Sequence, residues 1–451
     1  MKNSALIYVP SDTPEAMSIT TAKVAGVPLI VRGIMTLADA GVESIALLMA
    51  ESQRQKVERF LERYGDKKLP SIDIITYAEP YRVSSDIVKR IVDGAAGRLL
   101  MINGNLIFEK ELLANVRRTA LRDGRVLLCE EGAHRIPVID ITPAALATLI
   151  DFTEQRPRSI ESCLAQLAEL AEDERAKLPV KSYTFLLKSF RDRAVAEKAL
   201  AESIRLGTPG PVARYINKRI SLPISLFLSK LWVSPNSITG FNIILGVFAG
   251  VFAADGSNYW MILLGAGLFQ AASIVDGCDG EVAKFTFRCS KFGQYADTLS
   301  DNLSLGSMLT GIMAGYWRST HSPIAFYVGA IMLATTGLTI FWIMRYLKRN
   351  TQSASLATFD TAYLQKLSNQ PRWLLAFIRF GKYTLKKDAY SFFFLVFAAM
   401  GVLYWWLFIV ALGTTIAAAI LTYLNAQEWL SARSTGRAMP ASAKREAHSA
   451  C

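Results

Sequence analysis

Apolar and polar positions follow two different patterns in this chain, and the change comes near residue 205. Before it, short apolar runs alternate with amphipathic stretches, which is typical of a sheet whose strands are connected by helices. The expected strands are Ala5–Val9, Ser44–Met49, Ser71–Thr76, Gly97–Ile102 and Arg125–Cys129. The expected helices are one that begins at Leu29 and two at Glu51–Tyr64 and Val83–Asp93. Residues 1–145 therefore predict an α/β domain with a largely parallel sheet.

Beyond residue 235 the chain consists mostly of long apolar segments, as expected for a bundle of membrane-spanning helices. Four of them are separate, at residues 236–254, 258–281, 292–316 and 323–344. The last segment, 389–424, is too long for one crossing, because a helix rises about 1.5 Å per residue and a span needs about 20 residues. A break near Gly401–Trp406 divides it in two, so the pattern predicts six spans.

The stretch just before the first span combines basic and apolar positions, between residues 211 and 230. It predicts an amphipathic helix that lies in the membrane interface and is attracted to anionic lipid. A soluble amphipathic helix is the alternative. The whole chain is then a multidomain protein, divided as follows: 1–145 cytoplasmic α/β domain, 146–210 helical linker, 211–230 interfacial helix, 231–430 six-span bundle and 431–451 cytoplasmic tail.

The charges of the loops predict how the bundle is oriented. The formal net charge of the chain is +12, and nine of its basic residues lie in the single loop 345–388. The loop 255–257, on the opposite side of the bundle, has none. Cytoplasmic loops carry the excess of Lys and Arg, so we expect a multi-pass protein of the cell (inner) membrane with both termini in the cytoplasm. Contact with membrane lipid then explains the charge, and no nucleic-acid partner is expected. The five cysteines show no metal-binding spacing, which argues against a zinc site.

Four carboxylates stand out in the second and third apolar segments: Asp276, Asp279, Asp297 and Asp301. The first two are three residues apart and the last two are four apart, so each pair shares a helix face. Carboxylates in apolar helices are costly unless they are paired or bind cations, and an all-carboxylate group suits a hard divalent ion. Two such ions could bridge a diphosphate. The alternative is the carboxylate cluster of an ion transporter that carries a cytoplasmic sensor domain.

The spacing of these residues resembles the signature of the CDP-alcohol phosphotransferases, D-x2-D-G-x2-A-R-x8-G-x3-D-x3-D. Seven of its eight fixed positions are matched, and Lys284 stands at the eighth, where the family has Arg. The segment Ser234–Thr239 also resembles the P-N-x-x-T start of the family's first span. The matched positions are Asp276, Asp279, Gly280, Ala283, Gly293, Asp297 and Asp301.

This resemblance implies transfer of a substituted phosphate from a CDP-linked alcohol to an acceptor hydroxyl, with release of CMP, in phospholipid or phospho-polyol synthesis. It implies two divalent ions, Mg²⁺ or Mn²⁺, held by Asp276, Asp279 and Asp297. Asp301 would be the catalytic base and would also touch a metal. The CDP group would contact Asn236, Thr239, Gly280, Ala283, Lys284 and Gly293. Lys284 offers a point charge in place of a bidentate guanidinium, and a polar residue near 234–236 could instead cap the first span.

Two basic residues of the loop 345–388, Arg345 and Lys387, are candidates for binding a phosphorylated acceptor near the metals. The alternative is that such charges only set topology and contact lipid headgroups.

The segment Lys23–Ile30 and the segment Leu37–Ile45 resemble the opening of sugar-phosphate nucleotidyltransferases, which have a Rossmann-like α/β fold. The resemblance is to a degenerate member, because the loop 10–14 after the first strand has no glycine to cradle a triphosphate. Asn103 and Asn105 also stand where the family has a metal-binding Asp. The pair of domains resembles bifunctional inositol-phosphate cytidylyltransferase/di-inositol-phosphate phosphate synthases. We expect a homodimer, with the first domain serving dimerisation, regulation or substrate capture.

Overall fold

The computed structural model describes residues 4–10, 14–64, 69–77, 84–94, 98–118, 126–131, 134–142, 162, 175–177, 184–350 and 386–434. They form two compact units. The first consists of residues 1–207 with two short segments, 226–232 and 285–287, and the second contains the rest of the chain. The segment 351–385, which carries four of the nine basic residues counted above, and the segment after residue 434 lie outside the described residues.

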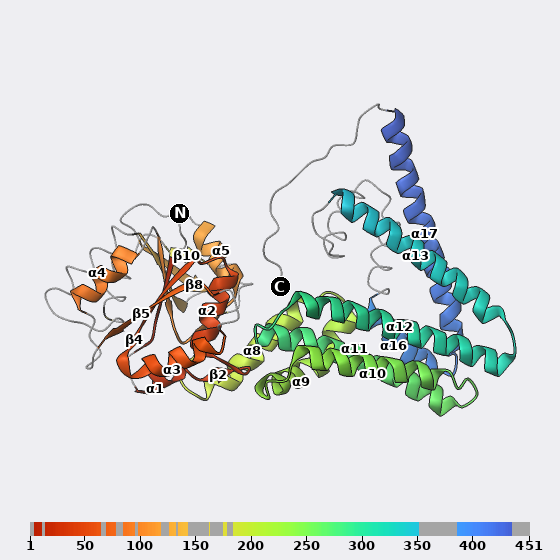
Figure 1. Cartoon of the computed structure of the whole chain (residues 1–451), viewed down its shortest axis with the longest axis horizontal. Coiled ribbons are helices and arrows are strands. Elements are labelled where there is room, and N and C mark those ends of the chain that lie inside the picture. The colour runs from red at the N-terminus through yellow and green to blue at the C-terminus, as the bar shows by residue number, and fades with distance from the viewer. Residues whose placement is uncertain are drawn as a thin grey trace. The chain divides into compact units, whose positions relative to one another are not determined.

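A seven-stranded mixed sheet forms the centre of the first unit (Figure 1). Its strands follow the order β10-β8-β9-β6-β1-β4-β5. Strands β6, β1, β4 and β5 are parallel neighbours, whereas β9 runs antiparallel to both β6 and β8. The bounds are β1 Ser4–Tyr8, β4 Ser44–Ala50, β5 Ser71–Tyr77, β6 Leu99–Asn103, β8 Val126–Glu131, β9 His134–Ile141 and β10 Arg175–Lys177. The five predicted strands are all present, and the parallel pairing around β1 agrees with the α/β prediction.

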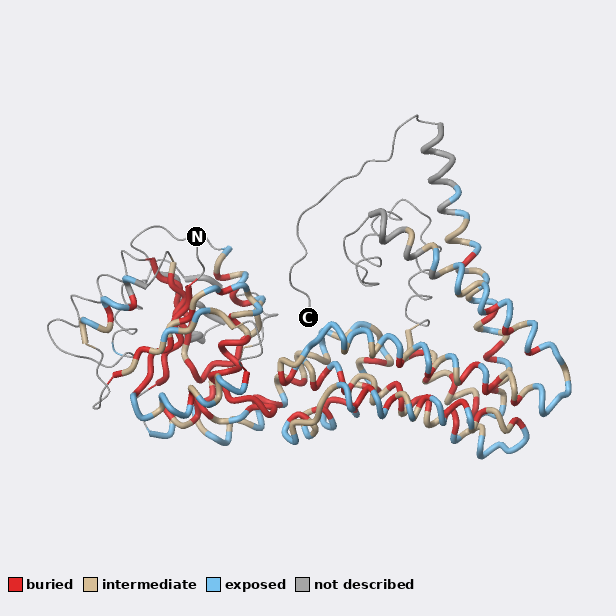
Figure 2. Tube along the Cα trace, in the orientation of Figure 1, coloured by how far each residue is buried: buried red, intermediate tan, exposed pale blue. Residues whose placement is uncertain are grey.

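The central strands of this sheet are buried, as Figure 2 shows for the core of the unit. Helix α2 (Leu29–Asp39) lies against it with nearly every side chain buried, and α2 contacts both α3 (Glu51–Glu62) and α5 (Lys110–Arg118). Helices α1 (Pro14–Ile19) and α4 (Ser85–Gly94) complete this set. Two small antiparallel pairs, β2 (Lys23–Val24) with β3 (Val27–Pro28) and β7 (Leu106–Phe108) with β11 (Thr184–Leu186), stand apart from the main sheet.

The expected helical linker at 146–210 differs from the structure. Strand β10 lies within this range and pairs with β8 at the edge of the main sheet, and β11 pairs with β7. Among the described residues of the range, a long helix appears only at α8 (Asp192–Gly207). The chain therefore returns to the α/β unit before it enters the helical unit. Strands of three residues cannot be predicted from periodicity, because three positions are too few to establish an alternation of apolar and polar residues.

The second unit consists of helices, and six of them occupy the predicted apolar segments. Three of these, α10, α11 and the part of α17 at Leu403–Tyr423, are long and apolar enough to cross a membrane. The described part of the chain therefore supports three candidate spans, and the count of six stays a prediction, as does the placement of both termini. The break in the last segment falls at residues 400–402, with Gly401 in the left-handed region, close to where it was predicted. The six helices are α10 Pro235–Ala253, α11 Tyr259–Phe285, α12 Lys291–Thr320, α13 Ile324–Asn350, α16 Lys387–Ala399 and α17 Leu403–Ser434.

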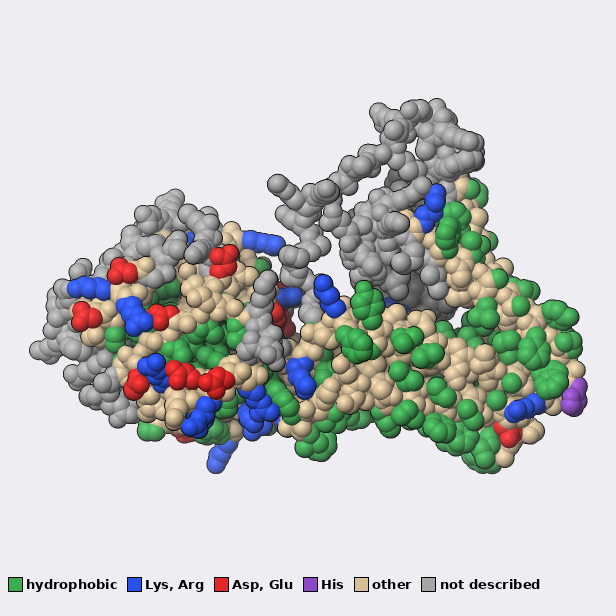
Figure 3. Space-filling model, viewed as in Figure 1, with side chains coloured by type: hydrophobic (Ala, Val, Ile, Leu, Met, Phe, Trp, Pro, Cys, Tyr) green, Lys and Arg blue, Asp and Glu red, His purple; other side chains and the backbone are tan. Residues whose placement is uncertain are grey.

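The predicted interfacial helix forms as a π-helical turn η1 (Ala213–Asn217) that continues into α9 (Lys218–Lys230). Its exposed side includes Ile220, Ile224 and Phe227, whereas Ser221 and Ser225 are fully buried. This is the reverse of a water-soluble amphipathic helix, and it fits apolar surroundings such as lipid. Figure 3 shows the same preference on the visible face of the helical unit, where apolar side chains are spread along the helices.

Helices α10 and α12 are in backbone contact. A Cβ atom at Gly250 would overlap the carbonyl oxygen of Ser307, and one at Gly311 would overlap that of Gly250. Glycines at a helix interface permit this close approach, which is common in membrane bundles. Helices α13 and α17 form a second close pair, in which Thr335 donates to Thr414 at 3.0 Å.

Candidate active site

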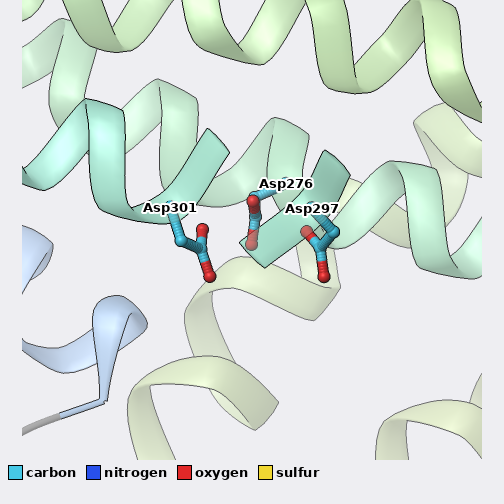
Figure 4. Close-up of side chains that lie close together, drawn as sticks. All are labelled: Asp276, Asp297 and Asp301. Atoms are coloured by element: carbon cyan, nitrogen blue, oxygen red, sulfur yellow. The ribbon is translucent and has the colours of Figure 1, made fainter. Parts of the chain in front are cut away.

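Three of the four predicted carboxylates lie together in the second unit. Asp276 of α11 meets Asp297 and Asp301 of α12, and one oxygen from each lies within 4.8 Å of the others (Figure 4). All three side chains are partly buried. Asp276 lies 21 positions before Asp297 and 25 before Asp301, and the three come together because α11 and α12 are antiparallel helices joined by the short loop 286–290.

Asp279, the fourth predicted carboxylate, lies outside this group of three. It is buried, and its Oδ2 accepts a hydrogen bond of 2.5 Å from the hydroxyl of Thr239. Thr239 was predicted to contact the CDP group, and here its hydroxyl also lies 3.2 Å from the Pro235 carbonyl oxygen. The resulting link fixes the start of α10 to the carboxylate-bearing turn of α11.

Asn242, which sequence analysis did not single out, bridges three helices. Its amide nitrogen donates to Asp276 Oδ1 at 2.8 Å and to the Ser300 hydroxyl at 3.0 Å. Asn242 is completely buried, and a buried amide requires such partners. The signal was in the sequence: Asn242 follows Thr239 by three residues, so two polar side chains share one face of an otherwise apolar segment.

Lys387, predicted as an acceptor residue, reaches directly into the carboxylate group. Its ammonium lies 2.9 Å from Asp276 Oδ1 and also contacts Asp301 Oδ1. The lysine side chain is only 9% exposed. One ammonium faces three carboxylates, so the group keeps an excess of negative charge, and negative charge of this kind favours a divalent cation.

A chain of buried amides and hydroxyls supports the residue next to this lysine. Asn217 of η1 donates to Asp388 at 2.6 Å, and Gln270 of α11 donates to Asn217 at 2.9 Å. Ser391 donates in turn to Gln270 at 2.9 Å. The network joins η1, α11 and the first turn of α16, and it thereby holds the backbone that carries Lys387.

The remaining predicted positions are spread around the group. Asn236 is exposed, and a Cβ atom at Gly293 would lie 3.4 Å from its Oδ1, so these two positions are adjacent. Gly280 has open space beside it, Ala283 is half-buried and Lys284 is exposed. The open space at Gly280 leaves room for a ligand, and the Gly280 backbone is a hydrogen-bond partner of the Asp279 carboxylate.

Arg345 contacts Trp342 instead, with its guanidinium 5.9 Å from the centre of the indole ring. Among the described residues, no hydrogen bond or ion pair joins Arg345 to the carboxylate group. Of the two predicted acceptor residues, only Lys387 is therefore brought to the carboxylates.

Residues 232–378, which include the carboxylate group, match the family model of the CDP-alcohol phosphatidyltransferases. The chain carries a CDP-alcohol phosphatidyltransferase domain. It is thus an enzyme of the CDP-alcohol phosphotransferase type, and no relative supports the alternative of an ion transporter.

Two relatives extend this likeness beyond the domain. A bifunctional IPC transferase and DIPP synthase from Aquifex aeolicus (strain VF5) is 26% identical over 303 residues, which cover 62% of this chain and 68% of that protein. One of the same name from Thermococcus kodakarensis (strain ATCC BAA-918 / JCM 12380 / KOD1) is 23% identical over 345 residues, covering 69% and 74%. The solved structure of the inositol-1-phosphate CTP transferase from T. maritima has 11% identity and a TM-score of 0.35, and the match covers 46% of this chain and 98% of that one. A structural likeness this low assigns no activity.

The first testable prediction concerns Asn242. Replacing it in Asn242→Ala removes the donor to Asp276 and leaves this partly buried carboxylate less well oriented. We expect CMP release from a panel of CDP-linked alcohols to fall about 10- to 100-fold, the usual effect of losing a group that orients a metal-binding carboxylate. Asn302→Ala is the matched control, because Asn302 is exposed on α12 and donates only to its own helix. Equal activity of the two variants would contradict the bridging role.

Proposed function

We propose that the carboxylate group of α11 and α12 is the centre where a CDP-linked alcohol gives up its substituted phosphate to an acceptor hydroxyl. The observation that supports this is the convergence of Asp276, Asp297 and Asp301 within 4.8 Å, on the two helices that carry the family's spacing. CMP is the leaving group. Both a lipid-linked and a soluble CDP-alcohol fit this proposal, and so do lipid and polyol acceptors.

The donor set fits divalent metal ions. Carboxylate oxygens are the ligands that Mg²⁺ and Mn²⁺ prefer, and no sulfur or imidazole lies in the group of three. Asp276, Asp297 and Asp301 would hold one ion, and Asp279 would join a second after its bond from Thr239 rearranges. When bound, the ions would neutralise the charge of the diphosphate and of the leaving oxygen.

Asp301 is the residue proposed to accept the proton of the acceptor hydroxyl. Its contact with Lys387 keeps the carboxylate oriented. An ionised carboxylate has no proton to donate, so it can accept the hydrogen bond of the acceptor hydroxyl and then take up its proton. The hydroxyl oxygen then forms the new bond to phosphorus as the bond from phosphorus to the CMP oxygen breaks. The burial of Asn242, Thr239 and Ser300 behind the carboxylates excludes water from that side of the centre.

The proposed base predicts the behaviour of Asp301→Asn. Its amide has nearly the same shape but accepts no proton at neutral pH, so Mg²⁺- or Mn²⁺-dependent CMP release should fall by about 10²- to 10⁴-fold. The control is Asp255→Asn, in the loop between α10 and α11, where the carboxylate accepts from the backbone of Asn258. CMP release that is independent of divalent metal, or unchanged in Asp301→Asn, would overturn the proposal.

Lys387 is proposed to bind a phosphate on the acceptor. Because its ammonium already lies at Asp276 and Asp301, a phosphate held there would place a neighbouring hydroxyl beside the reacting centre. The second predicted acceptor residue, Arg345, is left without this support.

Lys387→Met is therefore expected to raise the KM for phosphorylated acceptors about 10- to 100-fold, as expected for losing a hydrogen bond to a charged group. The KM for acceptors without phosphate should change much less. Lys386→Met, which removes the adjacent positive charge, serves as the control. An equal rise for both kinds of acceptor would show that Lys387 acts on the carboxylates alone.

The first unit is proposed to have no nucleotidyltransferase activity of its own. The buried Asn105, at a place where a metal-binding Asp was expected, accepts from Thr20 at 2.5 Å and donates to the Ala16 carbonyl at 2.9 Å. Both the oxygen and the nitrogen of this uncharged amide therefore form hydrogen bonds within the fold. Dimerisation, regulation and substrate capture stay the predicted roles of this unit, and a homodimer stays a prediction.

This proposal predicts that the full-length protein releases no pyrophosphate from CTP when it is given polyol or sugar phosphates and Mg²⁺. Release is measured with a coupled phosphate assay, with an active cytidylyltransferase as the positive control. Pyrophosphate release that depends on both CTP and the phosphorylated compound would refute it.

A further inference from the structure

A second buried carboxylate on α11 has no part in the proposed chemistry. Glu281 is 2% exposed, and its two oxygens receive three donors from α9. The Lys218 ammonium lies 2.5 Å from Oε1, the Ser221 hydroxyl lies 2.6 Å from the same oxygen, and the Ser225 hydroxyl lies 2.7 Å from Oε2. A charged group is tolerated in such a place only when it is fully paired, and here it is.

The three donors explain the unusual polarity of α9. Ser221 and Ser225 are four residues apart and Lys218 precedes Ser221 by three, so all three project from one side of the helix. Both serines are fully buried, while Ile220 and Ile224 face outward. The polar side of α9 is therefore directed at a single carboxylate, and Glu281 determines how this helix is rotated against α11.

The position of Glu281 on α11 also matters. At 3.6 residues per turn, Glu281 is about 140° around the helix from Asp276 and about 160° from Asp279. Helix α11 is thus held on two opposite sides. Thr239 and Asn242 bind its metal-site face, and α9 binds the other face through Glu281.

We propose that Glu281 is a positioning residue: by pairing with Lys218, Ser221 and Ser225 it fixes the rotation of α11 and so directs Asp276 and Asp279 toward α12. A helix rotated by a small angle about its axis would carry the two aspartates away from Asp297 and Asp301. This inference rests on the proposed metal site.

The test measures Mn²⁺ binding to the full-length protein in lipid nanodiscs. Binding is detected as a decrease in the electron paramagnetic resonance signal of free Mn²⁺. It needs no substrate, so it is independent of activity. Glu281→Gln is expected to weaken Mn²⁺ binding about 10- to 100-fold, as for other groups that orient metal-binding residues. The double variant Ser221→Ala/Ser225→Ala, which keeps the ion pair and disturbs folding less, is expected to weaken it at least about threefold.

Asp140→Asn is the matched control, because Asp140 is also a buried carboxylate, 2% exposed, and it pairs with Arg98 in the first unit, away from α9. It should lower the thermal unfolding temperature without changing Mn²⁺ affinity. If both α11–α9 variants bind Mn²⁺ as tightly as the unmodified protein, the positioning role is refuted. Asp276→Asn distinguishes failure of the positioning role from failure of the proposed metal site. If this variant retains full Mn²⁺ affinity, the proposed metal site itself is wrong.

Discussion

The second unit depends on one electrostatic constraint: a carboxylate inside an apolar bundle must find partners that replace water. Each of the three acidic groups on α11 meets this requirement through neighbouring elements. Asp276 is served by α10 and α16, Asp279 by α10, and Glu281 by α9. The polar contacts of this one helix therefore orient α9, α10 and α16 around it.

The grouping of the carboxylates in the candidate site was predictable because they occur at fixed helical spacing. The carboxylates of α11 and α12 are local pairs, so their shared faces follow from residue numbers alone. Lys387 was predicted, with Arg345, as a residue that binds the acceptor, but its contact with Asp301 over 86 positions depends on tertiary packing and was not predicted. Glu281 and Asn242 were missed for the same reason. Helical spacing indicates which face of a helix these two residues share with other polar residues, but it does not identify a partner that lies on another helix.

In the first unit the strands β1, β4, β5, β6 and β8 were predictable, whereas β9 and the three-residue strands β10 and β11 were not. Strands β1 and β4 are almost continuous apolar runs, β5 has isoleucines at alternating positions with Asp73 between them, and helices separate the three strands. Strand β9 contains Arg135, Pro137 and Asp140 among its apolar residues, which breaks the alternation of a strand pattern. Asp140 is nevertheless buried, paired with Arg98, and its pKa is raised because burial outweighs the guanidinium. Tertiary pairing of this kind overrides a local pattern.

The glycine contacts between α10 and α12 have a mechanical consequence. Since backbone meets backbone at Gly250 and Gly311, neither helix can slide or turn past the other without steric overlap. Thr239 and Asn242 on one helix, and Asp297 and Asp301 on the other, are thus parts of one rigid frame. Substrate entry and product exit must then be accommodated by elements outside this frame. Helix α16 contacts this frame through the long side chain of Lys387. That side chain can change its conformation while Thr239, Asn242, Asp297 and Asp301 keep their relative positions.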